Sequence, residues 1–176
     1  MLKLMKLRDL KWRKFNMAKN YNLLEVTPTI NTAEYAVGDC LFVSTEIPNF
    51  FRGANDAAEI KSLTIIDRSV DAPAMYVYLT TNSTTLGALN ATADGADAVV
   101  DDVQCIIPVV AADFLGGADF TDTCGVACIT DPANDGIGCI VSSNGSSSLY
   151  ICAILAAGVE TFAVGDLTFK IGIKYI

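Results

Sequence analysis

The chain has 176 residues, of which 52% are apolar and 18% are charged, and its formal net charge is −8. This length suits one domain, and the apolar content is enough for a sizeable core, which argues against intrinsic disorder. The sequence contains no histidine, so the commonest general base and metal ligand is missing, and no apolar run is long enough for a transmembrane helix.

The charges are divided unevenly along the chain. Seven of the twelve basic residues lie in the first 19 positions, whereas residues 20–176 carry five basic and nineteen acidic residues, a balance of −14. Binding of nucleic acid depends on Lys and Arg side chains that neutralise phosphates. We therefore expect neither DNA nor RNA as a partner of the main body.

The N-terminus differs from the rest in composition. Residues 1–16 are basic and amphipathic, so we expect a basic N-terminal arm over residues 1–20 and a single domain over residues 21–176. Three interpretations of the arm compete: an upstream-start artefact or disordered tail, a segment that docks on an acidic neighbour, and a helix on a membrane surface. The first is favoured, and no membrane partner is expected.

Beyond residue 25 the chain consists of short β-rich runs separated by turn residues. This spacing predicts an all-β fold: an antiparallel β-sandwich or jelly-roll-like barrel of about eight or nine short strands. The predicted strands are Cys40–Ser44, Ile60–Asp67, Met75–Thr80, Ala98–Val100, Gln104–Val110, Val126–Thr130, Gly138–Val141, Leu149–Leu155 and Leu167–Tyr175.

The runs differ in their patterning. Leu167–Tyr175 alternates apolar and polar residues, which predicts a half-buried strand with one wet face. Met75–Leu79 and Leu149–Ala157 are apolar on both faces, which is typical of central strands; a helix is the alternative for Leu149–Ala157. Single helical turns are expected at Asn55–Glu59 and Ala111–Leu115.

One local pattern occurs twice. Tyr35-Ala-Val-Gly-Asp39 and Phe162-Ala-Val-Gly-Asp166 each place an aromatic residue before a Gly-Asp turn and a strand. Glycine permits positive φ and aspartate can accept a hydrogen bond from its own backbone, so both segments predict a sharp entry into a strand. An internal repeat and convergent turn chemistry are the two explanations, and the second is favoured.

Cysteines and carboxylates are the remaining residues with chemistry to consider. Cys124, Cys128, Cys139 and Cys152 could form a four-thiolate zinc site or a disulfide, but their spacing and strand-like flanks favour buried free thiols, as for Cys40 and Cys105. The acidic clusters at 94–102 and 113–122 lack a calcium-binding loop and are interpreted as solvated charge. No catalytic residue, cofactor or metal is therefore assigned, and we do not expect an enzyme.

Two segments are candidates for contact with a partner. The Phe50-Phe51-Arg52 loop combines adjacent aromatic residues with an arginine, a composition typical of interface hot spots. The alternative is that Phe50 and Phe51 plug the end of the sandwich. The stretch Tyr21–Glu34 supplies the other candidates, which are Tyr21, Leu23 and Leu24.

Four segments carry a resemblance to a known family. Asn31–Phe42, the strand Ile60–Asp67, the apolar strand Ala74–Leu79 and the run Tyr150–Ile173 resemble a family of tailed-phage virion proteins common in marine phages. The resemblance covers about half of the chain and includes no catalytic motif. The cysteine-rich region Cys124–Cys139 and residues 1–16 depart from the family pattern.

The resemblance implies a structural role in the virion. We expect a capsid decoration or cement subunit that is made in the host cytoplasm and resides on the capsid surface. Its partners would be the major capsid protein and further copies of itself, as a trimer that covers surplus apolar surface. The alternative is a host-recognition module of a tail fibre or spike, which would use the polar loops Asn82–Asn90 and Ser142–Ser148.

Overall fold

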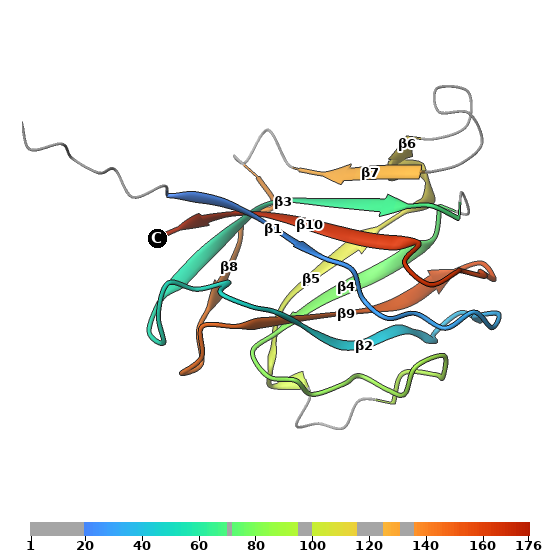
Figure 1. The fold of residues 1–176 in the computed structure, drawn as a ribbon, viewed down its shortest axis with the longest axis horizontal. Helices are drawn as coiled ribbons and strands as arrows, with labels where there is room; N and C mark the ends of the chain where they lie inside the picture. The colour runs from blue at the N-terminus through green and yellow to red at the C-terminus, as the bar shows by residue number, and fades with distance from the viewer. Residues whose placement is uncertain (1–19, 70–71, 95–99, 116–124, 131–135) are drawn as a thin grey trace, which may run out of the picture.

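A computed structural model describes residues 20–69, 72–94, 100–115, 125–130 and 136–176 of the chain. Within these residues, ten antiparallel strands form two sheets that pack face to face as two layers (Figure 1). The predicted antiparallel β-sandwich is therefore confirmed. The N-terminal arm lies almost entirely outside the described residues.

Each layer is one continuous hydrogen-bonded sheet. The six-stranded sheet has the order β1 (Tyr21–Val26), β10 (Leu167–Tyr175), β3 (Ala57–Asp67), β7 (Gly125–Ile129) and β6 (Phe114–Leu115), and β8 (Cys139–Ser142) also pairs with β3. The four-stranded sheet has the order β2 (Cys40–Ile47), β9 (Leu149–Ala157), β4 (Ala74–Thr80) and β5 (Val103–Val109). A 3₁₀ turn, Ala111–Asp113, precedes β6.

Strands β7 and β8 together occupy one position in the six-stranded sheet. β7 pairs with residues 63–67 of β3, and β8 pairs with residues 57–60 of the same strand. Gly136, in the segment between them, has φ of 122°, and a Cβ there would lie 2.8 Å from the carbonyl oxygen of Lys61. Only glycine fits so close to the neighbouring backbone, so the chain at Gly136 can lie directly against β3.

This arrangement gives the topology of the sandwich. With β7 and β8 counted as one interrupted strand and the two-residue β6 set aside, the strands follow the orders 1-8-3-6 and 2-7-4-5. These are the orders of an eight-stranded jelly roll. The same pairings describe one long antiparallel ribbon, in which β1 pairs with β10, β2 with β9, β3 with β7 and β8, and β4 with β5, rolled into two layers.

The repeated Ala-Val-Gly-Asp turns lie together where this ribbon passes from one sheet to the other. The backbones of Tyr35 and Glu160 pair across the ribbon, and the Tyr35 and Phe162 rings meet edge to face at 5.7 Å. In one turn the Asp39 carboxylate accepts a hydrogen bond from the Ala36 amide at 2.8 Å, and Asp166 makes the equivalent bond in the other. Both strands of the ribbon need the same bend here, which is sufficient to explain the shared sequence.

The core lies between the two sheets. The Phe42 ring of β2 and the Phe169 ring of β10 meet across the layers at 5.2 Å, and both side chains are fully buried. Ile171 and Ile173 follow Phe169 on the inner side of β10, whereas Lys170 and Lys174 lie on its other side. The predicted alternation of Leu167–Tyr175 is therefore confirmed.

Other predictions of local structure met different outcomes. β4 and β9 are the two central strands of their sheet, as predicted, so the helical alternative for Leu149–Ala157 is wrong. The helical turn predicted at Asn55–Glu59 is also wrong, because β3 begins at Ala57 and pairs with both β8 and β10. At Ala111–Leu115 a 3₁₀ turn gives way to strand β6.

Two further differences concern strand boundaries. Strand β1 was missed, and its backbone is fixed by pairing with β10 from Tyr21–Lys174 to Val26–Phe169. The strand predicted at Ala98–Val100 lies largely outside the described residues, and Val100 itself belongs to no strand.

Candidate interaction surfaces

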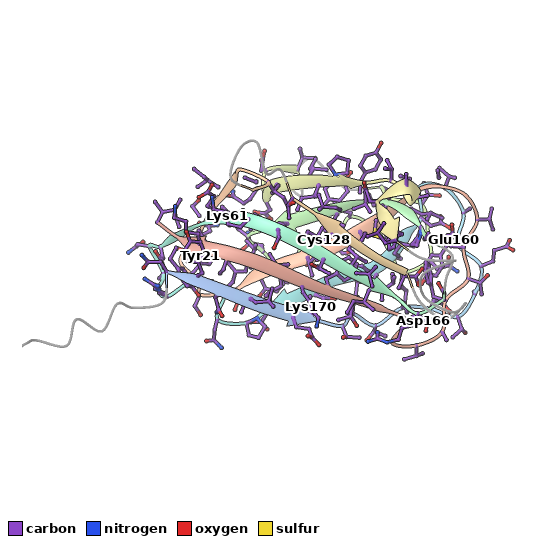
Figure 2. The ribbon with its side chains drawn as sticks, turned by 90° about the horizontal axis from the view of Figure 1, so that it is seen from above. Tyr21, Lys61, Cys128, Glu160, Asp166 and Lys170 are labelled. Atoms are coloured by element: carbon purple, nitrogen blue, oxygen red, sulfur yellow. The ribbon has the colours of Figure 1, made fainter. Side chains whose placement is uncertain are left out.

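The outer face of the six-stranded sheet carries the positive charge of the main body (Figure 2). Lys61 lies on β3, and Lys170 and Lys174 lie on β10. The other two basic residues beyond position 19 contact the same sheet: Arg52 lies 4.0 Å above the Tyr175 ring, and Arg68 donates to the Thr168 hydroxyl at 3.0 Å. All five basic residues of the body therefore gather around one sheet.

Acidic partners on this face neutralise part of that charge. Lys170 Nζ of β10 lies 3.1 Å from a carboxylate oxygen of Glu25 on β1. Lys61 Nζ lies 2.8 Å from Glu59 Oε1, and both of these residues belong to β3. The Lys170–Glu25 pair is partly exposed, and such pairs add little stability, whereas the Lys61–Glu59 pair is more buried. The six-stranded sheet thus presents an ordinary solvated surface.

A shallow groove of about 470 Å³ crosses one end of this face. Gly172 of β10 forms part of its lining, and a Cβ there would collide with Ser62 Oγ. Tyr21 and Leu23 of β1 line one side, and Lys61 of β3 lines the other; Figure 2 shows Tyr21 and Lys61 at the same end of the sheet. The groove exists because glycine leaves the middle strand without a side chain between two flanking strands.

Three sequence-predicted contact residues remain accessible, two of them at this groove. Tyr21 is 61% exposed and Leu23 is 63% exposed, whereas Leu24 points to the opposite side and packs against the core. Arg52 lies at the same end, because its partner Tyr175 also accepts, at its hydroxyl, a hydrogen bond from the side-chain amide of Asn22 at 3.4 Å. Two segments that are separate in sequence therefore meet at the start of β1.

Phe50 and Phe51 do not form part of any exposed surface. Their exposed fractions are 0% and 3%, and their rings meet edge to face at 4.9 Å. The Phe51 amide donates to the carbonyl of Ser147, which ties this loop to the loop before β9. Phe50 and Phe51 therefore fill the end of the sandwich, and their side chains are too buried in this chain to contact a partner.

The outer face of the four-stranded sheet has a different composition. Strands β4, β5 and β9 contain no Asp, Glu, Lys or Arg at all. Tyr76 is 44% exposed and Ile106 is 51% exposed, and their cross-strand neighbours Pro108 and Tyr78 lie on the same side. We call the outward side chains Tyr76, Tyr78, Ile106, Pro108 and Ile154 the uncharged face.

Part of the outer face of this sheet is covered by the residues that follow β4. In Figure 1 the residues that follow β4, up to residue 94, run along the outer side of the four-stranded layer. The Cys40 amide donates to the carbonyl of Ala91, and the Asn90 amide donates to the carbonyl of Cys40, so residues 89–93 pair with the chain at Gly38–Cys40, where β2 begins. Asp102 fixes the segment by accepting hydrogen bonds from Asn82 and Thr84, each at 2.7 Å.

Three cysteines are buried within or beneath these elements. Burial, with the nearby carboxylates of Asp94 and Asp39, raises the pKa of Cys40 to about 11. Burial and the neighbouring Cys40 raise the pKa of Cys152 to about 12, and burial also raises the pKa of Cys105. These thiols are protonated and unreactive at neutral pH, in keeping with the buried-thiol interpretation.

Cys128 differs from these, because it is exposed on the outer face of the six-stranded sheet (Figure 2). Cys124 lies outside the described residues. Among the residues that the structure describes, no three Cys, Asp or Glu side chains come together as a metal site would require, and no helix is long and apolar enough to cross a membrane.

No family model and no curated protein matches the chain. Solved structures that are similar include the VP2 subviral particle of infectious bursal disease virus, with 13% identity over 89% of this chain and a TM-score of 0.24. The Gt strain of the same virus gives 10% identity over 89% of this chain and a TM-score of 0.20. This chain spans about two fifths of the length of those proteins, at 41% and 42%.

Proposed function

We propose that this chain is a structural protein of a virus particle and acts as a decoration or cement subunit on the head of a tailed phage. In this role it binds the major capsid protein and stabilises the shell through protein–protein contacts, with no catalytic step. Its location would be the capsid surface. The body carries a balance of −14, which would keep a crowded particle surface soluble.

The jelly-roll order of the strands is the observation that carries this proposal. Two rigid sheets with the orders 1-8-3-6 and 2-7-4-5 form an architecture that recurs in viral capsid domains. The uncharged face adds a reason specific to this chain, because an apolar sheet surface is typical of proteins that bind other proteins.

The alternative is a host-recognition module, and one observation favours it: jelly rolls also occur in lectins. Such a module would use the polar loops at 82–90 and 142–148. Several of their side chains already bond within the chain, since Asn82 and Thr84 bind Asp102 and the Ser148 hydroxyl donates to Glu46 at 2.6 Å. These loops therefore have fewer free polar groups to offer to a sugar, which ranks this function second.

Copy number and binding separate the two functions. Purified particles of the virus that encodes the chain should contain it at about the copy number of a capsid component, measured by quantitative gel against the major capsid protein. The isolated chain should also co-sediment with shells that lack it. A few copies per particle, with binding to host cells and none to shells, would replace the decoration role with the adhesin role.

A further inference from the structure

Side chains of β5 and β8 join the two sheets along one side of the sandwich. The side-chain oxygen of Gln104 on β5 accepts hydrogen bonds from the amide and the hydroxyl of Ser142 on β8, both at 3.3 Å. At the other end of β8, the Cys139 thiol donates to the backbone carbonyl of Gln104 at 3.6 Å. Because β5 belongs to the four-stranded sheet and β8 to the six-stranded sheet, these bonds form a seam between the layers.

This seam brings two cysteines together. Cys105 follows Gln104 on β5, and its side chain is buried on the inner side of that sheet, in line with Ile107 and Val109. Cys139 packs against the same core from β8 and keeps part of its surface exposed. Burial, and then the hydrogen bond and the charge of Cys139, raise the pKa of Cys105. Two thiols from different sheets therefore lie within reach of one another.

We propose that Cys105 and Cys139 are a site of oxidative modification, at which a low-molecular-weight disulfide such as oxidised glutathione converts the two thiols into a disulfide bond between β5 and β8. The Cys139 thiolate attacks one sulfur of the small disulfide and releases one small thiolate. Cys105 then attacks Cys139 Sγ and releases the second. Each released thiolate takes up the proton that the attacking cysteine lost, so the two protein thiols are oxidised and the small disulfide is reduced to two thiols.

The surroundings of the two thiols determine the order of these steps. On its own Cys105 is unreactive at neutral pH, because the thiolate is the attacking species and burial raises the pKa of this thiol. The partly exposed Cys139 is the one that a small disulfide can reach. Once Cys139 carries the small group, Cys105 already lies beside it. A neighbour held in place acts at a high effective concentration, which offsets its small ionised fraction.

The same reasoning separates this pair from the other described cysteines. Cys40 and Cys152 are each only 2% exposed, so neither offers a sulfur to an incoming disulfide. Cys128 is exposed, but its side chain lies on the outer face of the six-stranded sheet, where it accepts a hydrogen bond from the Thr64 hydroxyl. Cys128 is therefore a suitable internal measure of how well the oxidant reacts with an accessible thiol of this chain.

The bond would strengthen the seam between the sheets. It would close a loop over residues 106–138 and tie the edge strand β5 to the four-residue strand β8. A cross-link between residues far apart in the sequence stabilises a fold mainly by restricting the unfolded chain. We therefore expect the oxidised chain to be more stable than the reduced chain. This inference does not depend on the proposed function.

The test uses the full-length chain, purified with reductant and then treated with about 1 mM oxidised glutathione at about pH 8. Peptide mass spectrometry without reduction, after alkylation of the remaining thiols, should find the peptide that contains Cys105 joined to the peptide that contains Cys139. The melting temperature should rise by about 5–10 °C over that of the reduced chain. Cys128→Ser should leave both results unchanged, whereas Cys139→Ser should abolish both.

Several results would overturn the proposal. Glutathione that remains on Cys139 would show that Cys105 does not complete the exchange, and a bond from either residue to another cysteine would show a different pairing. Free Cys105 and Cys139 in a chain whose Cys128 has reacted would show that the oxidant does not enter the seam. A joined pair without a rise in melting temperature would show that the bond does not strengthen it. All of these results come from the wild-type chain, so they hold even if Cys139→Ser fails to fold.

Discussion

The two outer faces of this sandwich are made by the same kind of strand and yet have opposite surfaces. The six-stranded sheet displays Lys61, Lys170 and Lys174 with nearby carboxylates, whereas the central strands of the other sheet display tyrosine and isoleucine. Water hydrates the charged side chains of the first surface favourably, whereas hydration of the apolar side chains on the second surface is unfavourable. The difference teaches that strands of the same sandwich can present a charged outer surface on one sheet and exposed tyrosine and isoleucine side chains on the other.

The inner sides of the two sheets should contribute equally despite this difference. Phe42→Ala and Phe169→Ala should each lower the free energy of unfolding by about 3–5 kcal/mol, because each empties a fully buried site. The double variant should lose less than the sum, since the two rings contact each other at 5.2 Å. Urea denaturation measures all three, with Leu23→Ala as the exposed control. If only one of the two substitutions lowered the free energy of unfolding strongly, the two sheets would not contribute equally to the core.

The thiols should make stability fall at high pH. Cys40 and Cys152 have pKa values of about 11 and about 12 in the folded chain, against an ordinary value of 9.0. Above pH 9 the unfolded chain loses protons that the folded chain keeps, so the stabilisation is complete below pH 9 and disappears as the pH rises through 11 to 12. Urea denaturation with reductant at pH 8 and pH 10 should differ by about 1 kcal/mol for each thiol.

Variants and labelling check the origin of this effect. Cys152→Ala should reduce the loss between the two pH values, whereas Cys128→Ala on the opposite, solvated face should not. Iodoacetamide should modify Cys128 of the native chain well before Cys40 or Cys152, as read by peptide mass spectrometry. Equal labelling of the three sites would show that the segment over β2 does not protect the buried pair.

The two Ala-Val-Gly-Asp turns allow a matched comparison, because one leads into each sheet. Asp39→Ala and Asp166→Ala each remove one carboxylate that accepts a hydrogen bond from a backbone amide. Each substitution should therefore lower the free energy of unfolding, measured by urea denaturation, by about 1 kcal/mol. Replacement by asparagine keeps an acceptor and should cost less. If the two substitutions lowered the free energy of unfolding unequally, the shared sequence would not reflect the same structural role in the two turns.

The smallest effect is expected on the charged face. Lys170→Met and Glu25→Gln each break an ion pair whose side chains are 33% and 58% exposed. A double-mutant cycle should give a coupling energy of less than about 0.5 kcal/mol, and added salt should reduce it further. A coupling of several kcal/mol would mean that the charged face helps to hold the sheets together.

Patterning in the sequence predicts the strands more fully than it predicts the surfaces. The alternation of Leu167–Tyr175 identifies a strand with one face toward the core and one toward solvent. The runs that are apolar on both faces identify the two central strands β4 and β9. β1 was missed because its pairing partner, β10, lies about 150 residues away, and no local pattern encodes that contact. The helical turn expected at Asn55–Glu59 failed for the same reason, since tertiary pairing overrides weak local propensity.

The candidate surfaces were harder to predict. Phe50 and Phe51 look like loop residues, and their burial depends on the distant loop that contains Ser147. The uncharged face is visible in the sequence as strands that are apolar on both sides. Its position required the sheet order, which places β4 beside β5 and so brings the outward side chains of Tyr76 and Ile106 onto neighbouring strands.

The rolled ribbon also determines when the chain can fold. Tyr21 pairs with Lys174, so β1 has no partner in its sheet until β10 has also left the ribosome. Among the described strands, β4 with β5 and the two-residue β6 with β7 are the pairs of neighbours in the chain, and the longer pairing of β4 with β5 makes that end of the ribbon the natural place for ordered structure to start. The ribbon would then close from this bend toward the two ends. Until β10 arrives, apolar strands stay exposed, so we expect slow maturation and dependence on chaperones during synthesis.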